Sequence, residues 1–304
     1  MPALTRKAAA EGIVLLKNNN ALPYKLDTKI SVFGRCQLDY FYVGYGSGGD
    51  VNAPYFVNVI DGIKNAGGHV NEWLLEYYKD FTKNNPAPHG FWGHWPMNFE
   101  EPSLDDKMIE RASEESDVAL VVIGRAAGED RENTLTKGSY YLTDEERTLL
   151  DNVCNHFSNV TVLLDCGNII DMQWVLDYEE RLRGIIYAWQ GGMESGNAIA
   201  DVLFGRVNPS GRLTDTIAVR YEDYPSAMHF GNKLFNTYVE DIFVGYRYFE
   251  TFSKEKALFP FGYGLSYTNF DIEVLDFKTD NDKIKVVLNT DYKDYLKDIE
   301  YDTL

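Results

Sequence analysis

The stretch VALVVIGRAAGEDREN, residues 118–133, decides the fold class of this sequence. It begins with six consecutive apolar residues, most of them β-branched, as is typical of a strand buried on both faces of a parallel sheet. The run ends at Gly124, and a polar loop containing Arg125, Glu129, Asp130 and Arg131 follows. Loops that leave the carboxyl ends of strands bind ligands in open α/β sheets. These charged residues are therefore either a candidate site or a solvated, charge-balanced turn.

Helical and strand-like segments alternate from residue 5 to about residue 205. Apolar spacing and capping residues predict helices over 5–17, 56–66, 103–113, 143–157 and 197–204. Thr143 and Glu146 have the spacing of a capping box. Strands are expected over 29–34, 118–123, 159–165 and 183–189. This alternation predicts an α/β fold, a doubly wound and mostly parallel sheet with helices on both faces.

Four of the expected strands end in polar loops that contain glycine. These loops begin at Gly34-Arg35, Gly124-Arg125, Asp165-Cys166-Gly167-Asn168 and Trp189-Gln190-Gly191-Gly192. Carboxyl ends of parallel strands meet at one edge of a sheet, so we expect the four loops to lie together. Four such loops at one edge favour a functional site more strongly than one loop does.

Composition restricts the partners that this chain can have. The 304 residues are 44% hydrophobic and 25% charged, with a formal net charge of −18. Such a surface repels nucleic acid phosphates and anionic membranes, so neither is expected as a partner, whereas uncharged sugars meet no such penalty. The three cysteines have no metal-ligand spacing and no apolar run is long enough to cross a membrane. We therefore expect a cytoplasmic protein without a metal or other cofactor.

Two further motifs allow alternative interpretations. Residues 44–49, GYGSGG, match G-x-G-x-x-G, but the expected strand ends ten residues earlier and no helix follows directly. Dinucleotide binding needs that context, so a flexible loop that approaches a ligand is the better interpretation. Trp92 and Trp95 lie in a long proline-rich loop. They form either a lid that stacks on a sugar or part of the core.

Five stretches resemble the α/β sandwich domain of glycoside hydrolase family 3, the β-glucosidase family. They are residues 8–24, 32–52, 123–133, 187–216 and 240–270, and together they cover nearly all of residues 5–270. The resemblance implies an α/β sandwich domain over 1–220 and an extended aromatic linker that packs on it over 221–264. It also implies the start of an incomplete fibronectin type III-like β domain over 265–304. Such a domain needs about 100 residues, so open strand edges are expected.

The resemblance implies retaining hydrolysis of terminal β-linked sugars such as glucosides. The loop that carries the family's acid/base glutamate is similar to residues 123–133, and that glutamate maps onto Glu129. A glycosidase needs this acid to protonate the leaving oxygen and a second carboxylate as nucleophile. Around Glu129 we expect six substrate-binding residues: Arg35, Tyr45, Ser47, Asp130, Arg131 and Trp189.

The sequence departs from the family pattern in one major respect. A (β/α)8 barrel carries the family's nucleophile, and its S-D-W and K-H-F motifs do not occur in these 304 residues. The order of motifs looks most like members in which the sandwich comes first and the barrel follows. We therefore expect the barrel as a partner and little activity of this chain alone. The alternatives are a non-catalytic carbohydrate-binding or subunit-docking module and, less favoured by the motifs, a nucleotide-dependent protein.

Overall fold

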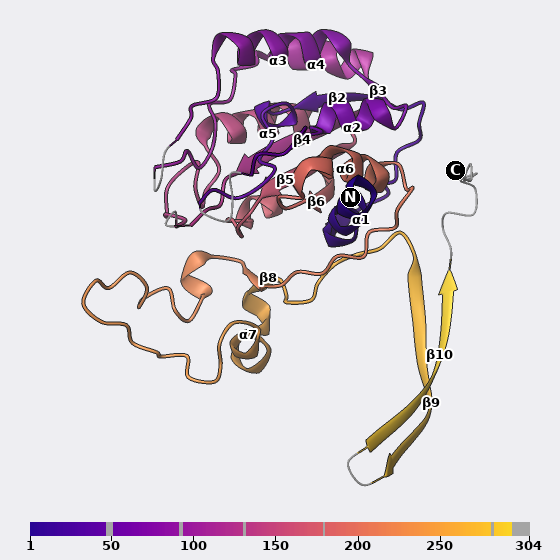
Figure 1. Cartoon of the computed structure of the whole chain (residues 1–304), viewed down its shortest axis with the longest axis vertical. Helices are drawn as coiled ribbons and strands as arrows, with labels where there is room; N and C mark the ends of the chain where they lie inside the picture. Colours follow the sequence, from indigo (N-terminus) through magenta and orange to yellow (C-terminus); the bar gives the residue numbers. More distant parts are fainter. Residues whose placement is uncertain (47–50, 91–93, 130–131, 179, 281–282, 294–304) are drawn as a thin grey trace.

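A computed structural model describes residues 1–46, 51–90, 94–129, 132–178, 180–280 and 283–293. Its centre is a six-stranded sheet in the order β1-β6-β5-β4-β2-β3 (Figure 1). Strand β1 is antiparallel to β6, and the other neighbours are parallel. The predicted α/β fold with a mostly parallel sheet is confirmed. The strands of this sheet are β1 (Val14–Asn18), β2 (Lys29–Phe33), β3 (His69–Val70), β4 (Val118–Arg125), β5 (Val160–Cys166) and β6 (Leu182–Tyr187).

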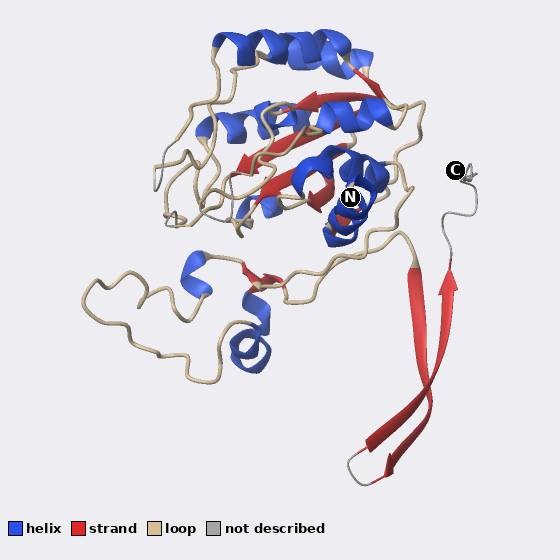
Figure 2. Ribbon diagram, viewed as in Figure 1, coloured by secondary structure: helices blue, strands red, loops and turns tan. Residues whose placement is uncertain are grey.

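Helices cover both faces of the sheet, as Figure 2 shows. Helices α2 and α6 contact each other on one face, and α4 and α5 contact each other on the other. Helix α1 packs on α6. The helices are α1 (Pro2–Gly12), α2 (Val59–Asn65), α3 (Glu72–Asn84), α4 (Asp106–Glu115), α5 (Asp144–His156), α6 (Ser195–Leu203) and α7 (Tyr246–Phe252).

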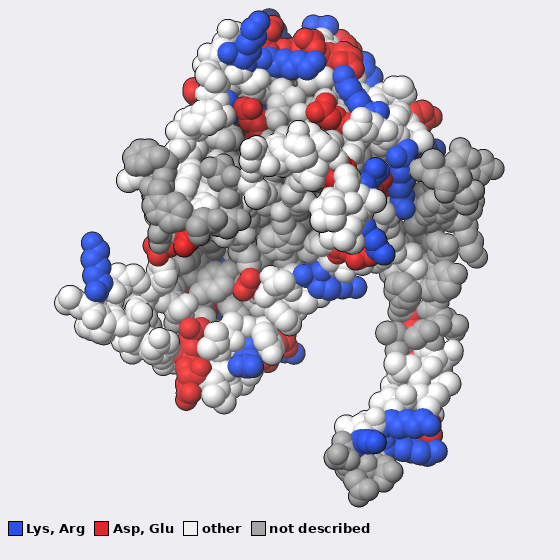
Figure 3. All heavy atoms as spheres, in the orientation of Figure 1, with Lys and Arg blue, Asp and Glu red and all other residues white. Residues whose placement is uncertain are grey.

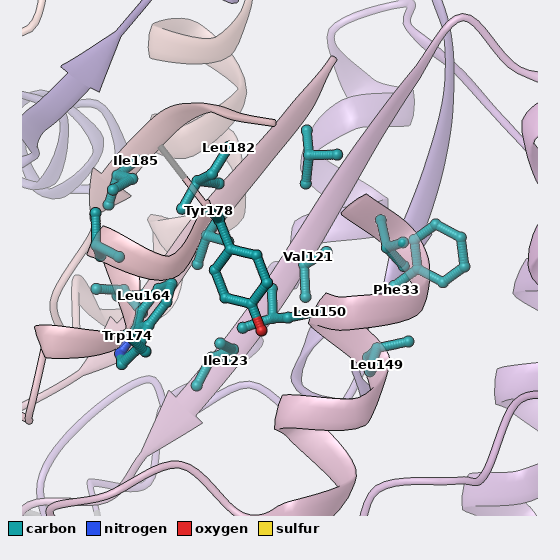
Figure 4. Packing of buried hydrophobic residues seen from close by; sticks show 14 of the residues in the cluster. Phe33, Val121, Ile123, Leu149, Leu150, Leu164, Trp174, Tyr178, Leu182 and Ile185 are labelled. Atoms are coloured by element: carbon teal, nitrogen blue, oxygen red, sulfur yellow. The ribbon is translucent and has the colours of Figure 1, made fainter. Parts of the chain in front are cut away.

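Strand β4 joins two hydrophobic clusters because its side chains alternate between the faces of the sheet. Ala119, Val121 and Ile123 lie in the cluster beneath α5, whereas Leu120 and Val122 lie in the cluster beneath α2 and α6. Figure 4 shows the first cluster closely packed. All eight residues of β4 are buried, so the predicted double burial of this strand is confirmed.

The N-terminal helix is shorter than the sequence pattern predicts. The predicted helix over 5–17 is wrong at its carboxyl end, because α1 ends at Gly12 and β1 begins at Val14. Residues 13–16 are four consecutive apolar residues, and all four are buried. A continuous apolar run suits a strand covered on both faces better than one stripe of a helix.

The start of α5 agrees with the prediction from the sequence, whereas the start of α4 does not. The Thr143 hydroxyl accepts a hydrogen bond from Glu146 N–H, and the Glu146 carboxylate accepts one from Thr143 N–H. The predicted capping box is therefore confirmed. The helix predicted over 103–113 begins later, because α4 is capped by Asp105, whose carboxylate accepts a hydrogen bond of 2.8 Å from Met108 N–H. Leu104 is buried ahead of this cap.

The C-terminal part of the chain extends away from the sheet (Figure 1). Two short strands, β7 (Ile217–Ala218) and β8 (Ala257–Phe259), pair with each other, and a long ribbon of β9 (Asn269–Asp280) and β10 (Lys283–Lys293) follows. The ribbon fits the expected start of a fibronectin type III-like domain. Side chains between 228 and 252 include many exposed apolar ones, and Figure 3 shows mostly uncharged atoms there. Among the described residues, no helix has the length and apolarity that a membrane crossing needs.

Candidate active site

The loops that follow β2 and β4 are joined at the carboxyl edge of the sheet. Tyr45 N–H donates to Ala127 O at 2.7 Å, and Glu129 N–H donates to Tyr45 O at 3.0 Å. The two loops thus form a short parallel bridge beyond the ends of their strands. Ala126 N–H adds a third tie, to Met97 O at 2.8 Å. The backbone that carries Glu129 is therefore held on two sides.

Glu129 is exposed at this rim, and a glycine gives it room. Gly46 has a φ of 109°, and a Cβ atom at this position would lie 2.5 Å from the Cβ of Glu129. A larger residue would be both strained and in collision with the glutamate side chain. The glycine-rich segment after β2 therefore packs directly against the candidate acid.

Tyr45 is supported by the long loop that precedes α4. Its ring stacks on Trp95 with a centroid distance of 5.3 Å and an interplanar angle of 2°. Trp95 is buried and Tyr45 is half-buried. Of the two alternatives for Trp95, the packing role fits this geometry, whereas Trp92 lies outside the described residues.

Arg35 lies beside the same edge, but its side chain turns into the protein. Its Nε donates to Asp39 Oδ2 at 2.7 Å, and its two terminal nitrogens donate to Glu100 O at 3.2 Å and Asn85 O at 2.6 Å. The side chain is 2% exposed and its guanidinium also lies over the ring of Phe99. These contacts position the loop that follows β2. Direct binding of a ligand by Arg35 remains a prediction that these contacts do not favour.

Trp189 follows β6 and borders a large cavity at the same edge. Its backbone has a φ of 58°, an uncommon conformation for a bulky residue. Its indole N–H donates to Gly12 O at 3.1 Å, and the centroid of its ring lies 4.3 Å from the ring centroid of Tyr187. The cavity has a volume of about 1310 Å³. Its lining includes Asn133, Asn168, Trp189, Arg212, Asp215, Tyr221 and Tyr224.

Comparisons with known proteins identify the family. A family model described as the glycosyl hydrolase family 3 C-terminal domain matches residues 13–267. The chain belongs to this family. It is 48% identical over 273 residues to a β-glucosidase of Ruminococcus albus, a match that covers 90% of this chain and 29% of the relative. The chain spans about a third of the length of such curated relatives.

Solved structures of β-glucosidases match the fold of this family 3 domain. One from Paenibacillus barengoltzii is 47% identical with a TM-score of 0.92, covering 95% of this chain and 32% of that one. β-Glucosidase 3B from Thermotoga neapolitana, in complex with glucose, is 36% identical with a TM-score of 0.83. That match covers 94% of this chain and 41% of the other.

The structure brings some of the predicted site residues of the family 3 domain together. Tyr45 and Glu129 lie side by side, whereas Trp189 borders the cavity and Arg35 is buried. Ser47, Asp130 and Arg131 lie outside the described residues. No group of three or more His, Cys, Asp and Glu side chains is placed to hold a metal ion in the described part of the chain.

Arg125 and Asp165, which the sequence pattern assigns to polar loops at this edge, are instead buried at the ends of their strands. Arg125, the last residue of β4, forms an ion pair with Glu146, with 2.6 Å between Nη2 and Oε2. Asp165, near the end of β5, accepts a hydrogen bond of 2.7 Å from Phe41 N–H. Burial raises the pKa of Asp165 well above its usual value, which favours the neutral form of this carboxyl. A polar residue at the end of an apolar strand was the available signal for Arg125 and Asp165.

Proposed function

We propose that this chain supplies the general acid/base of a retaining glycoside hydrolase that removes terminal β-linked sugars, β-glucosides foremost. Glu129 donates its proton to the leaving oxygen while a second carboxylate attacks the anomeric carbon. It then takes a proton from the water that hydrolyses the glycosyl-enzyme. The observation that carries this proposal is the exposed position of Glu129 on a braced loop at the carboxyl edge of the sheet.

The second carboxylate comes from a (β/α)8 barrel in this proposal. The S-D-W motif of the nucleophile does not occur in the 304 residues, and the related β-glucosidases are about three times as long as this chain. A retaining mechanism needs the two carboxyl groups about 5–5.5 Å apart, so the barrel has to face this edge of the sheet. The chain alone is expected to show little or no hydrolysis.

The groups around Glu129 would bind the leaving part of the substrate. Tyr45 offers a half-buried aromatic face beside the acid, and Trp189 offers another at the mouth of the cavity. Aromatic faces pack against the apolar faces of sugars, amides both donate hydrogen bonds to sugar hydroxyls and accept them, and carboxylates accept them. Ser47, Asp130 and Arg131 remain proposed contacts from the resemblance alone.

A hybrid enzyme tests the acid/base role. The segment of the Ruminococcus albus β-glucosidase that matches this chain over 273 residues is replaced by the corresponding residues of this chain. Glu129→Gln should then slow hydrolysis of cellobiose by about 10²- to 10⁴-fold, the usual contribution of a general acid. The kcat/KM for a dinitrophenyl β-glucoside should fall far less, because it reports the first step, in which this leaving group departs without a proton.

The control is Glu145→Gln, which neutralises an exposed acid in the first turn of α5. It should leave both rates unchanged. Equal losses of kcat/KM on both substrates for Glu129→Gln would show that Glu129 does not protonate the leaving group. Full activity of Glu129→Gln would remove Glu129 from the mechanism.

The cavity favours a second candidate function, carbohydrate binding without catalysis. Its lining combines Trp189, Tyr221 and Tyr224 with amide and charged side chains, the composition of many sugar sites. Titration of the 304-residue chain with glucose and with cellobiose, followed by calorimetry, measures this binding directly. Trp189→Ala should weaken it. Tight binding together with a hybrid that is inactive even without substitution would favour this second function.

A further inference from the structure

The buried ion pair between Arg125 and Glu146 lies at the base of the loop that carries Glu129. Arg125 is the last residue of β4, and Glu146 is in the first turn of α5. The loop between these two elements spans residues 126–143 and includes Glu129 only four residues beyond Arg125. Any movement of the pair is therefore transmitted to Glu129 through a very short piece of chain.

All five N–H groups of the Arg125 guanidinium have an acceptor. The Nη1 group donates to Gly124 O and Glu146 Oε1, both at 2.7 Å. The Nη2 group donates to Glu146 Oε2 at 2.6 Å and to Tyr141 O at 3.2 Å, and Nε donates to Ser139 O at 3.1 Å. This side chain thus uses its full capacity for hydrogen bonds within the protein.

These acceptors belong to three different segments. Gly124 O is at the end of β4, next to Arg125 itself, Ser139 O and Tyr141 O are on the returning limb of the loop, and Glu146 is on the helix. A single planar group therefore closes the loop at its base. Glu146 Oε2 also accepts the N–H of Thr143, which ties the capping box of α5 to the same guanidinium.

The electrostatics of the site keep Arg125 charged. Burial disfavours the charged guanidinium, but the adjacent Glu146 carboxylate outweighs this effect and holds the pKa of Arg125 above its usual value. Replacing a buried ion pair with apolar residues often leaves stability unchanged, so stability alone does not account for such a pair. A role in fixing one conformation of the loop does account for it.

We propose that the Arg125–Glu146 pair is a positioning unit that sets the placement of Glu129 for proton transfer. This inference rests on the proposed acid/base function. Arg125 does not touch the substrate; it acts by holding the returning limb of the loop and α5 against the end of β4, four residues before Glu129. Lysine keeps the charge but lacks the planar fork, so it cannot bridge Glu146 and three carbonyl oxygens in the same geometry.

The first test uses the 304-residue chain itself and amide hydrogen exchange. Arg125→Lys should accelerate exchange of the Glu129 amide by about tenfold or more, as the bond to Tyr45 O opens more often. Amides in the middle of β5 should exchange at the unchanged rate. The matched control is Arg6→Lys, which alters a bidentate pair with Asp201 between α1 and α6, both contacts being 2.6 Å. Unchanged exchange at Glu129 in Arg125→Lys would overturn the proposal.

The second test measures catalysis in the hybrid enzyme. A displacement of about 1 Å can cost about 100-fold in rate, so Arg125→Lys should slow an alkyl β-glucoside strongly. The loss in kcat/KM on a dinitrophenyl β-glucoside should be at least about tenfold smaller, because that leaving group departs unprotonated in the first step. Glu146→Gln should show the same pattern, because the NH₂ group of the glutamine would replace a carboxylate oxygen that now accepts hydrogen bonds from Arg125 or Thr143.

The outcomes separate the two proposals. Equal losses on both substrates in Arg125→Lys would mean that the pair is merely structural, and would overturn this inference. If Glu129→Gln itself lacks the dependence on leaving group, the acid/base function fails instead. The exchange measurement would then still decide whether the pair holds the loop.

Discussion

The contact between α2 and α6 gives a sharp prediction about stability. Gly62 and Gly196 face each other across these helices, and both are buried. A Cβ atom on Gly196 would lie 1.9 Å from Asn58 O, and one on Gly62 would lie 1.9 Å from Gly196 O. Ordinary contact of a Cβ atom begins at 3.4 Å, so Gly196→Ala forces the helices about 1.5 Å apart. The colliding atoms belong to the backbone, so they cannot rotate away.

The expected cost follows from two opposing effects. Overpacking a close-packed core costs about 1–3 kcal/mol, and a collision with a backbone carbonyl belongs at the upper end. Alanine gains at most about 1 kcal/mol over glycine in a helix. The free energy of unfolding of Gly196→Ala should therefore fall by about 2 kcal/mol. With an m value of about 3 kcal/mol per M, the urea midpoint falls by about 0.7 M.

Urea unfolding followed by tryptophan fluorescence measures the change, since Trp95 and Trp174 are buried. Gly12→Ala is the matched control, because a Cβ atom there has no neighbour within 4 Å. It should change stability by less than about 0.5 kcal/mol. Gly62→Ala opens the same interface, so the double variant should cost less than the sum of the single ones. A Gly196→Ala protein as stable as the control would refute the reasoning.

Three further predictions concern pH, thiols and capping. Burial raises the pKa of Glu101 to about 8 in the folded protein, whereas the pKa in the unfolded chain is about 4.5. The contribution of this carboxyl to stability is therefore fully present below about pH 4.5 and is lost as the pH rises through 8. Stability of the wild type should therefore fall more steeply than that of Glu101→Gln between these pH values; parallel curves would contradict this. Cys36, Cys154 and Cys166 are buried with raised pKa values, about 11 for Cys154, so none should react with a chromogenic disulfide at pH 8 until urea is added. Thr143→Ala should cost about 1 kcal/mol in urea unfolding through loss of the capping bond, and an unchanged midpoint would argue against that bond.

The features that the sequence predicted correctly depend on a local pattern of residues. The run 118–123 is apolar throughout, so its burial on both faces followed without knowledge of its neighbours. The capping box at Thr143 was equally local. Strand β1 was missed because residues 13–16 fit a helical stripe as well as a strand. Its pairing with β6 joins residues such as Val14 and Tyr187, which are far apart in sequence.

The sequence predicted where the residues of the site lie in the fold, but not which atoms their side chains contact. The position of Arg35 after a strand correctly put it at the edge of the sheet, but nothing in the sequence showed that its guanidinium turns inward to Asp39 and two carbonyls. Arg125 and Glu146 are 21 residues apart, and they meet only because α5 returns over β4. Such side-chain directions depend on the folded backbone.

The bracing of the Glu129 loop has a consequence for how such enzymes are assembled. The hydrogen bonds of this loop include those to Tyr45, Met97 and the Arg125 guanidinium, which all belong to the same α/β domain. The contacts that hold Glu129 in position are therefore supplied by this domain, whichever polypeptide packs against it. In the proposed enzyme, the order in which a gene encodes this domain and the barrel could therefore change without altering the loop that carries Glu129.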